Sequence, residues 1–235
     1  MDFKTISSLA LSEHWRGAQA KDIALRQGDL DGACGLYALM MALLATGVVK
    51  RKKIEKIWDG DFHGRTKFAE WVRSFDALVS KGTKTSDLLS LFDAFTRLLK
   101  TSKMQECRMI EIAPSKARKT LATEAVFSSV RKHIDEYDTP ALMILDWTRD
   151  HAHWIVAVGY QLGPKQKNTG KQLVANILTL DSSSSISSTC VWNGLLGRGY
   201  LGDRKLRYLT EDDSRPTICS VSTMIGLVRK KVTSE

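Results

Sequence analysis

Residues 27–45 read QGDLDGACGLYALMMALLA, a polar, glycine-containing loop that runs into an almost entirely apolar segment. The segment predicts a helix over 33–46 that is apolar on every side, and a helix of that kind is buried. Cys34 lies in its first turn, where free backbone N–H groups and the positive end of the helix dipole favour a thiolate. Cys34 is therefore a candidate nucleophile, provided that a base for it lies elsewhere in the chain.

Helical periodicity continues through the first hundred residues. Apolar side chains recur at spacings of three and four over 65–80 and again over 85–100. The aromatic side chains in these stripes are more typical of a core than of a cofactor site. Residues 1–105 are therefore predicted to form a mainly helical lobe.

After Lys100 the pattern changes to short runs rich in β-branched residues. We predict a helix over 123–137, a basic loop over 162–172 and a terminal helix over 222–232. The predicted strands span 109–112, 141–147, 154–160, 173–180, 205–209 and 217–221. Residues 106–235 would form a mainly β lobe, giving one α+β domain over 1–235.

Composition narrows the class of protein. The chain has 235 residues, 43% of them apolar, and its four cysteines are widely separated with no Cys-x-x-Cys pair, so neither a disulfide framework nor a zinc site is indicated. No apolar run approaches the roughly 20 residues of a membrane span, and charged residues interrupt any N-terminal signal sequence. We expect a cytoplasmic protein, which could be delivered as an effector, without a cofactor or metal.

The best base for Cys34 lies in residues 151–160, which read HAHWIVAVGY. His153 begins a predicted strand, and Asp181 ends the next strand along the chain. If these strands pair antiparallel, His153 and Asp181 meet at one sheet edge, where the carboxylate can orient the imidazole. The backbone N–H of Cys34 and the side chain of Gln27 are candidate oxyanion donors. Together they supply the parts that acyl transfer by a thiol requires.

Other interpretations of these residues remain. His151 is the rival of His153, although its spacing to the following Gly-Tyr pair is less suitable. Asp150, His151 and His153 could hold a metal, but no further His or Cys cluster completes such a site. Asp146, at the end of the preceding predicted strand, is a weaker candidate for a catalytic role.

Three blocks of the sequence resemble those of papain-like cysteine peptidases in the order Gln, Cys, His, Asn/Asp: residues 27–44, 153–160 and 177–182. The resemblance is closest to the bacterial C39-like branch, which carries a similar Cys-Gly-x-x-Ala-Leu pattern. It implies a papain-like fold with the Cys helix packed on an antiparallel β lobe. It also implies the roles of Cys34, His153, Asp181 and Gln27 described above. A tryptophan shields the orienting residue in papain, a role that Trp192 would fill only in part here.

The expected function is a thiol hydrolase that cleaves peptide or isopeptide bonds in a protein or peptide substrate, with residues 59–64 and 183–202 lining the groove. A glutamine deamidase or a transglutaminase-type acyl transferase would use the same triad. The formal charge of +9 favours an acidic partner, nucleic acid included. A basic binding module with weak or lost catalysis is therefore the alternative from another class.

Overall fold

The computed structural model describes residues 2–9, 22–27, 33–58, 82–99, 101–113, 120–147, 151–167, 169–185, 190–199 and 202–229. The helical elements within these ranges are η1 (Ser7–Leu9), α2 (Cys34–Ala45), α3 (Arg51–Trp58), α6 (Thr85–Leu99), α7 (Ser102–Gln105) and α8 (Thr123–Tyr137). The helices predicted over 33–46, 85–100 and 123–137 are thus confirmed. The helix predicted over 65–80 and the groove residues 59–64 lie outside the described ranges.

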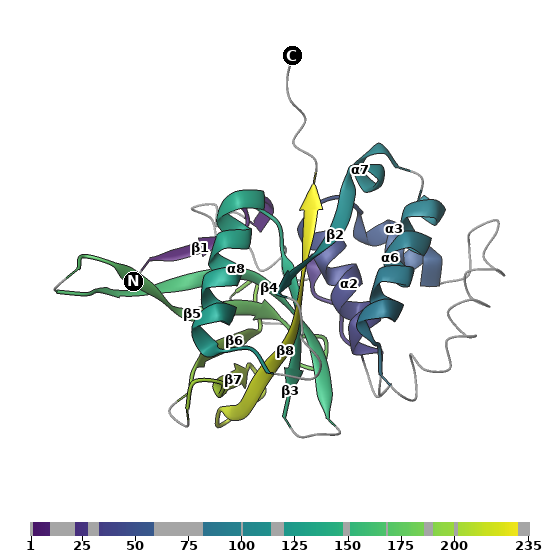
Figure 1. Ribbon diagram of the computed structural model, residues 1–235. Helices are drawn as coiled ribbons and strands as arrows, with labels where there is room; N and C mark the ends of the chain where they lie inside the picture. The colour runs from purple at the N-terminus through teal and green to yellow at the C-terminus, as the bar shows by residue number, and fades with distance from the viewer. Residues whose placement is uncertain are drawn as a thin grey trace, which may run out of the picture.

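The strands of the described residues form one antiparallel sheet, in the order β1-β4-β3-β8-β7-β6-β5 with β2 on β8. Because β5 pairs with β4 as well as with β6, six of the strands close into a barrel. Figure 1 shows α2, α3 and α6 together on one side of this barrel. The strands are β1 (Phe3–Thr5), β2 (Cys107–Ala113), β3 (Ala141–Asp146), β4 (Ala152–Lys165), β5 (Gln172–Leu180), β6 (Gly194–Arg198), β7 (Leu206–Thr210) and β8 (Thr217–Arg229).

The closed barrel corrects the expected fold class. The α+β papain-like arrangement, a helical lobe packed on a β lobe, is wrong, because the described chain is mostly sheet with few helices. Closure depends on pairing between strands that are distant in sequence, and periodicity within a segment carries no information about partners. The single domain with a division at residue 105 stays a prediction.

Two local predictions in the second half of the chain were also wrong. Residues 222–229 continue β8 instead of forming a terminal helix. Most of their side chains are buried, and a continuous apolar run cannot be assigned to strand or helix by periodicity alone. Residues 162–165 and 172 belong to β4 and β5, so the predicted basic loop is a hairpin with a short turn.

Helix α2 anchors the other elements because every one of its residues is buried. It packs along β4 and against β3 and α6 (Figure 1). Strand β4 is buried continuously from Trp154 to Tyr160, as expected for a strand covered on both faces. None of the helices in the described ranges has the length and apolarity to cross a membrane. The packing of α2 on β4 brings the start of the helix to the start of the strand.

Candidate functional site

Cys34 and His153 meet where α2 and β4 begin. Cys34 is the first residue of α2, and His153 is the second residue of β4. The His153 imidazole and the backbone N–H groups of Trp154 and Gly35 lie close enough to the Cys34 sulfur to lower the pKa of the thiol. The sulfur thus faces one ring and two main-chain donors.

The segment before α6 closes over this junction. The indole N–H of Trp154 donates to the Thr83 carbonyl oxygen at 2.7 Å, which fixes Thr83 beside β4. A Cβ atom built on Gly35 would lie 2.4 Å from the Thr83 Cβ. No side chain therefore fits at position 35 while α2 and the segment before α6 lie this close together.

Asp181 orients the imidazole from the end of β5. Strands β4 and β5 pair antiparallel, which meets the condition set for a contact between the two residues, and His153 Nε2 lies 2.7 Å from Asp181 Oδ1. Since Nε2 faces the carboxylate, the nitrogen left for the Cys34 sulfur is Nδ1. The structure therefore brings Cys34, His153 and Asp181 together in the order sulfur, imidazole, carboxylate.

The Asp181 carboxylate is almost fully buried, at 2% exposure, and is surrounded by donors. In addition to His153, Oδ1 accepts from the backbone N–H and the hydroxyl of Ser183, at 2.8 and 2.6 Å. Oδ2 accepts from the Tyr208 hydroxyl at 2.8 Å. Burial acts to raise the pKa of Asp181, but the hydrogen bond and charge of His153 and the two hydrogen bonds from Ser183 lower it by more. The carboxylate is accordingly ionised at neutral pH.

Three residues that support this arrangement were missed in the sequence. Asn193 accepts from the Asp181 backbone N–H and donates to its carbonyl oxygen, both at 2.8 Å. Trp147 packs its ring on His153, with centroids 5.7 Å apart, and on Tyr208 at 6.5 Å. The sequence feature that could have revealed them is Tyr208, an inward-facing tyrosine on an apolar strand, because its hydroxyl needs a buried hydrogen-bond partner.

The partial shielding by Trp192 stays a prediction. Trp192 stacks on Phe3, with ring centroids 6.0 Å apart, and Trp147 packs on the imidazole. Trp147 directly follows β3, the neighbour of β4 in the barrel, so this ring comes from before His153 in the sequence.

The charges of the site favour a thiolate and an imidazolium. Burial raises the pKa of Cys34. The hydrogen bond and charge of His153 and the N–H groups of Trp154 and Gly35 lower it by a larger amount, so the net pKa is below that of an ordinary thiol. Burial lowers the pKa of His153, but Asp181 and Cys34 together raise it to about 10. The two shifts describe one coupled pair in which each charge stabilises the other.

The pKa values of the other two buried cysteines are raised and not lowered. Burial raises the pKa of Cys107 to about 11 and that of Cys219 to about 12. Neither has an imidazole partner recorded in the described part of the chain. Low thiol pKa is therefore a property of the position of Cys34 and not of burial.

Gln27 lies beside the loop that follows Asp181. Its backbone N–H donates to the Ser182 carbonyl oxygen at 2.8 Å, and its side-chain oxygen accepts from the Ser182 hydroxyl at 3.1 Å. Residues 28–32, which link Gln27 to the cysteine, are outside the described ranges. The role of Gln27 as an oxyanion donor stays a prediction.

The rival residues His151 and Asp146 take no part in the interactions recorded among Cys34, His153 and Asp181. His151 is exposed, and Asp146 ends β3, where burial raises its pKa. Asp150 is outside the described residues, and within those that are described no three His, Cys, Asp or Glu side chains are grouped to hold a metal ion.

No family model matches this chain, and no curated protein matches it. The chemistry of Cys34 and its neighbours is therefore what indicates a function for this chain.

Proposed function

We propose that this protein is a thiol hydrolase that cleaves a peptide or isopeptide bond through a thioester at Cys34. The observation that carries the proposal is the continuous chain of contacts from the Cys34 sulfur through His153 to Asp181. A thiolate beside an imidazolium is the reactive form of a cysteine nucleophile, and a buried carboxylate keeps the imidazole in position.

The reaction follows from the two charges. The Cys34 thiolate would attack the carbonyl carbon, and the His153 imidazolium would give its proton to the nitrogen of the leaving amine as the C–N bond breaks. A water molecule would then lose a proton to the neutral imidazole and attack the thioester carbon. Departure of the carboxylic acid product returns sulfur and imidazole to the thiolate–imidazolium state, so protons and bonds balance over the cycle.

The first prediction concerns the pH dependence of alkylation. We expect Cys34 to react with iodoacetamide well below pH 7, because its thiolate is paired with His153. In His153→Ala the reaction should move to above about pH 8, near the range of an ordinary thiol. Peptide mapping after alkylation over a pH series measures both, with Cys107 and Cys219 as unreactive internal references in the folded protein.

His151→Ala is the matched control, because it removes an exposed imidazole two residues away. This variant should keep the acidic reactivity of Cys34. Reaction of wild-type Cys34 only above about pH 8, or only after unfolding, would contradict the proposal and favour the inert binding module.

A further inference from the structure

The β4–β5 hairpin extends past the rest of the barrel (Figure 1). Strand β1 pairs with β4 no further than Gln161, and β6 pairs with β5 no further than Asn176. Beyond Leu162 and Val174 the two strands pair only with each other in the described structure. Residues 162–167 and 169–174, called the arm below, therefore extend as a two-stranded ribbon. Its base is held by the Leu162 N–H, which donates to the Asp2 carbonyl oxygen at 2.8 Å, and by the side chains of Arg131 and Arg198, which donate to the carbonyl oxygens of Gln172 and Val174 at 3.0 and 3.2 Å.

The turn at the end of the arm is held by its own hydrogen bonds. The Gln166 N–H donates to the Lys171 carbonyl oxygen at 3.0 Å, and the Gly170 N–H donates to that of Gln166 at 2.8 Å. The Thr169 hydroxyl adds a bond to the Gln166 side chain at 2.9 Å. The side chains near the turn are thus presented from a defined backbone.

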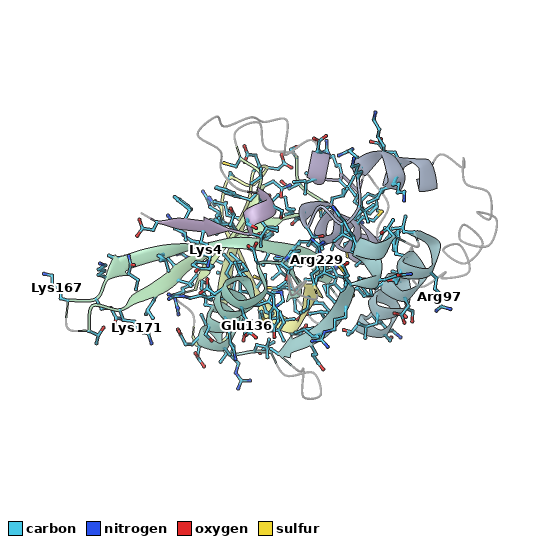
Figure 2. The ribbon with its side chains drawn as sticks, turned by 90° about the horizontal axis from the view of Figure 1, so that it is seen from above. Lys4, Arg97, Glu136, Lys167, Lys171 and Arg229 are labelled. Atoms are coloured by element: carbon cyan, nitrogen blue, oxygen red, sulfur yellow. The ribbon has the colours of Figure 1, made fainter. Side chains whose placement is uncertain are left out.

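The arm carries positive charge without compensation. Lys165, Lys167 and Lys171 are all exposed, and residues 151–180 include no Asp or Glu. None of the three lysines takes part in an ion pair recorded for the described residues. Figure 2 shows Lys167 at the outer tip of the arm and Lys171 on the side that leads back toward the body.

The same charge continues onto helix α8 at the base of the arm. A hollow of about 310 Å³ is lined by Lys171 together with Arg131 and Lys132 of α8. Its two carboxylates are already in ion pairs, Glu124 with Arg198, and Asp135 with Lys4 and with Arg131 of the hollow itself. The net field that a ligand meets on this face is therefore positive.

We propose that the arm docks on duplex DNA, with its lysines on backbone phosphates. A two-stranded β-ribbon fits the major groove of B-form DNA, whereas the major groove of A-form RNA is too narrow for side chains to enter. The arm has no aromatic residue on which unpaired bases could stack, which disfavours single strands. Lysine contacts of this kind recognise the phosphate backbone and not the base sequence.

The test is fluorescence anisotropy with the full-length protein and a labelled duplex of about 20 base pairs, between about 50 and 200 mM salt. In Lys165→Gln/Lys167→Gln/Lys171→Gln we expect affinity to fall at least about tenfold at the lowest salt. The slope of log K against log salt should become shallower by about 2 to 3, because each phosphate contact contributes about 0.9.

Lys52→Gln/Lys84→Gln/Lys103→Gln is the matched control. It removes the same charge from exposed lysines on the helical side of the molecule and should leave the slope nearly unchanged. Equal loss in both triple variants, or absence of duplex binding by the wild type, would overturn the proposal. So would arm-dependent binding that is stronger to hairpin RNA or to anionic lipid vesicles than to the duplex. Cys34 alkylation in the arm variant separates this result from the proposed hydrolase, since it tests the site independently.

Discussion

At the scale of single residues, the site depends on hydrogen bonds to one buried carboxylate. Asp181 could not remain ionised at 2% exposure without its donors, and Tyr208 supplies the one recorded for Oδ2. Burial and the charge of Asp181 raise the pKa of Tyr208 well above its ordinary value, so its hydroxyl stays protonated and can donate. Gly194 makes room for it, because a Cβ there would lie 2.6 Å from the Tyr208 oxygen.

Tyr208→Phe should therefore lower the free energy of unfolding by about 1–3 kcal/mol, since it leaves Oδ2 of a buried carboxylate without this partner. Urea denaturation monitored by fluorescence or circular dichroism measures the change. Tyr160→Phe is the matched control: its hydroxyl also donates to a carboxylate, Asp135, at 2.7 Å, but that carboxylate is exposed and ion-paired with Lys4. A loss in Tyr160→Phe as large as that in Tyr208→Phe would show that the buried position of Asp181 has no special importance.

At the scale of elements, helix α2 and the segment before α6 are matched in shape at Gly35. The Thr83 side chain occupies the space that a Cβ on Gly35 would need, with three of its atoms within 2.7 Å of that position. Thr83 is in turn fixed by the indole of Trp154. The helix that carries the cysteine and the strand that carries the histidine are thus connected through one threonine.

Gly35→Ala tests this packing against helix propensity. Alanine would favour the helix by about 1 kcal/mol relative to glycine, but overpacking costs about 1–3 kcal/mol, and the short distances place this case at the upper end. We expect a net loss of about 1–2 kcal/mol in the free energy of unfolding. The loss should be largely absent when the same substitution is made in a Thr83→Gly background. A stabilised Gly35→Ala single variant is the result that would refute the argument.

At the scale of the whole molecule, the charged pair exists only in the folded barrel. Cys34 comes from α2, His153 from the start of β4 and Asp181 from the end of β5, so unfolding separates all three. The pKa values of the pair must then return to ordinary ones, and folding stability is linked to pH.

The sign of this linkage differs between the two groups. The raised pKa of His153 contributes stability that is complete below 6.5 and is lost as pH rises toward about 10. The lowered pKa of Cys34 contributes stability that is complete above 9.0 and is lost as pH falls. Just below pH 9.0 the two trends oppose each other, so the pair's contribution changes less with pH there than above 9.0, where only the loss from His153 remains.

Urea denaturation of the wild type and of Cys34→Ala/His153→Gln over pH 5 to about 10 measures this contribution as a difference, in which other titrating groups cancel. We expect the difference in unfolding free energy to fall as pH rises above 9.0 and to change less with pH just below 9.0, where the gain from Cys34 opposes the loss from His153. A difference that falls as steeply just below pH 9.0 as above it would mean that thiol and imidazole are not a charged pair in the folded state.

The sequence alone indicated helices α2, α6 and α8 and the strand that follows His153, and it identified Cys34, His153 and Asp181 as candidates. Helix α2 was predictable because apolar residues on all its sides require burial, and the His153 strand because β-branched residues follow the histidine. Antiparallel pairing of β4 with β5 then followed as a hypothesis, which the structure confirms.

Only the tertiary structure decided the closed barrel, the continuation of β8 through Arg229, and the roles of Trp147, Asn193 and Tyr208. Each of these depends on contacts between segments far apart in the chain. Periodicity reports whether a residue faces a core or solvent, but it does not report which residue it faces. Which strand pairs with a given strand edge, and which acceptor a buried hydroxyl bonds, is decided only by the packing of the whole chain.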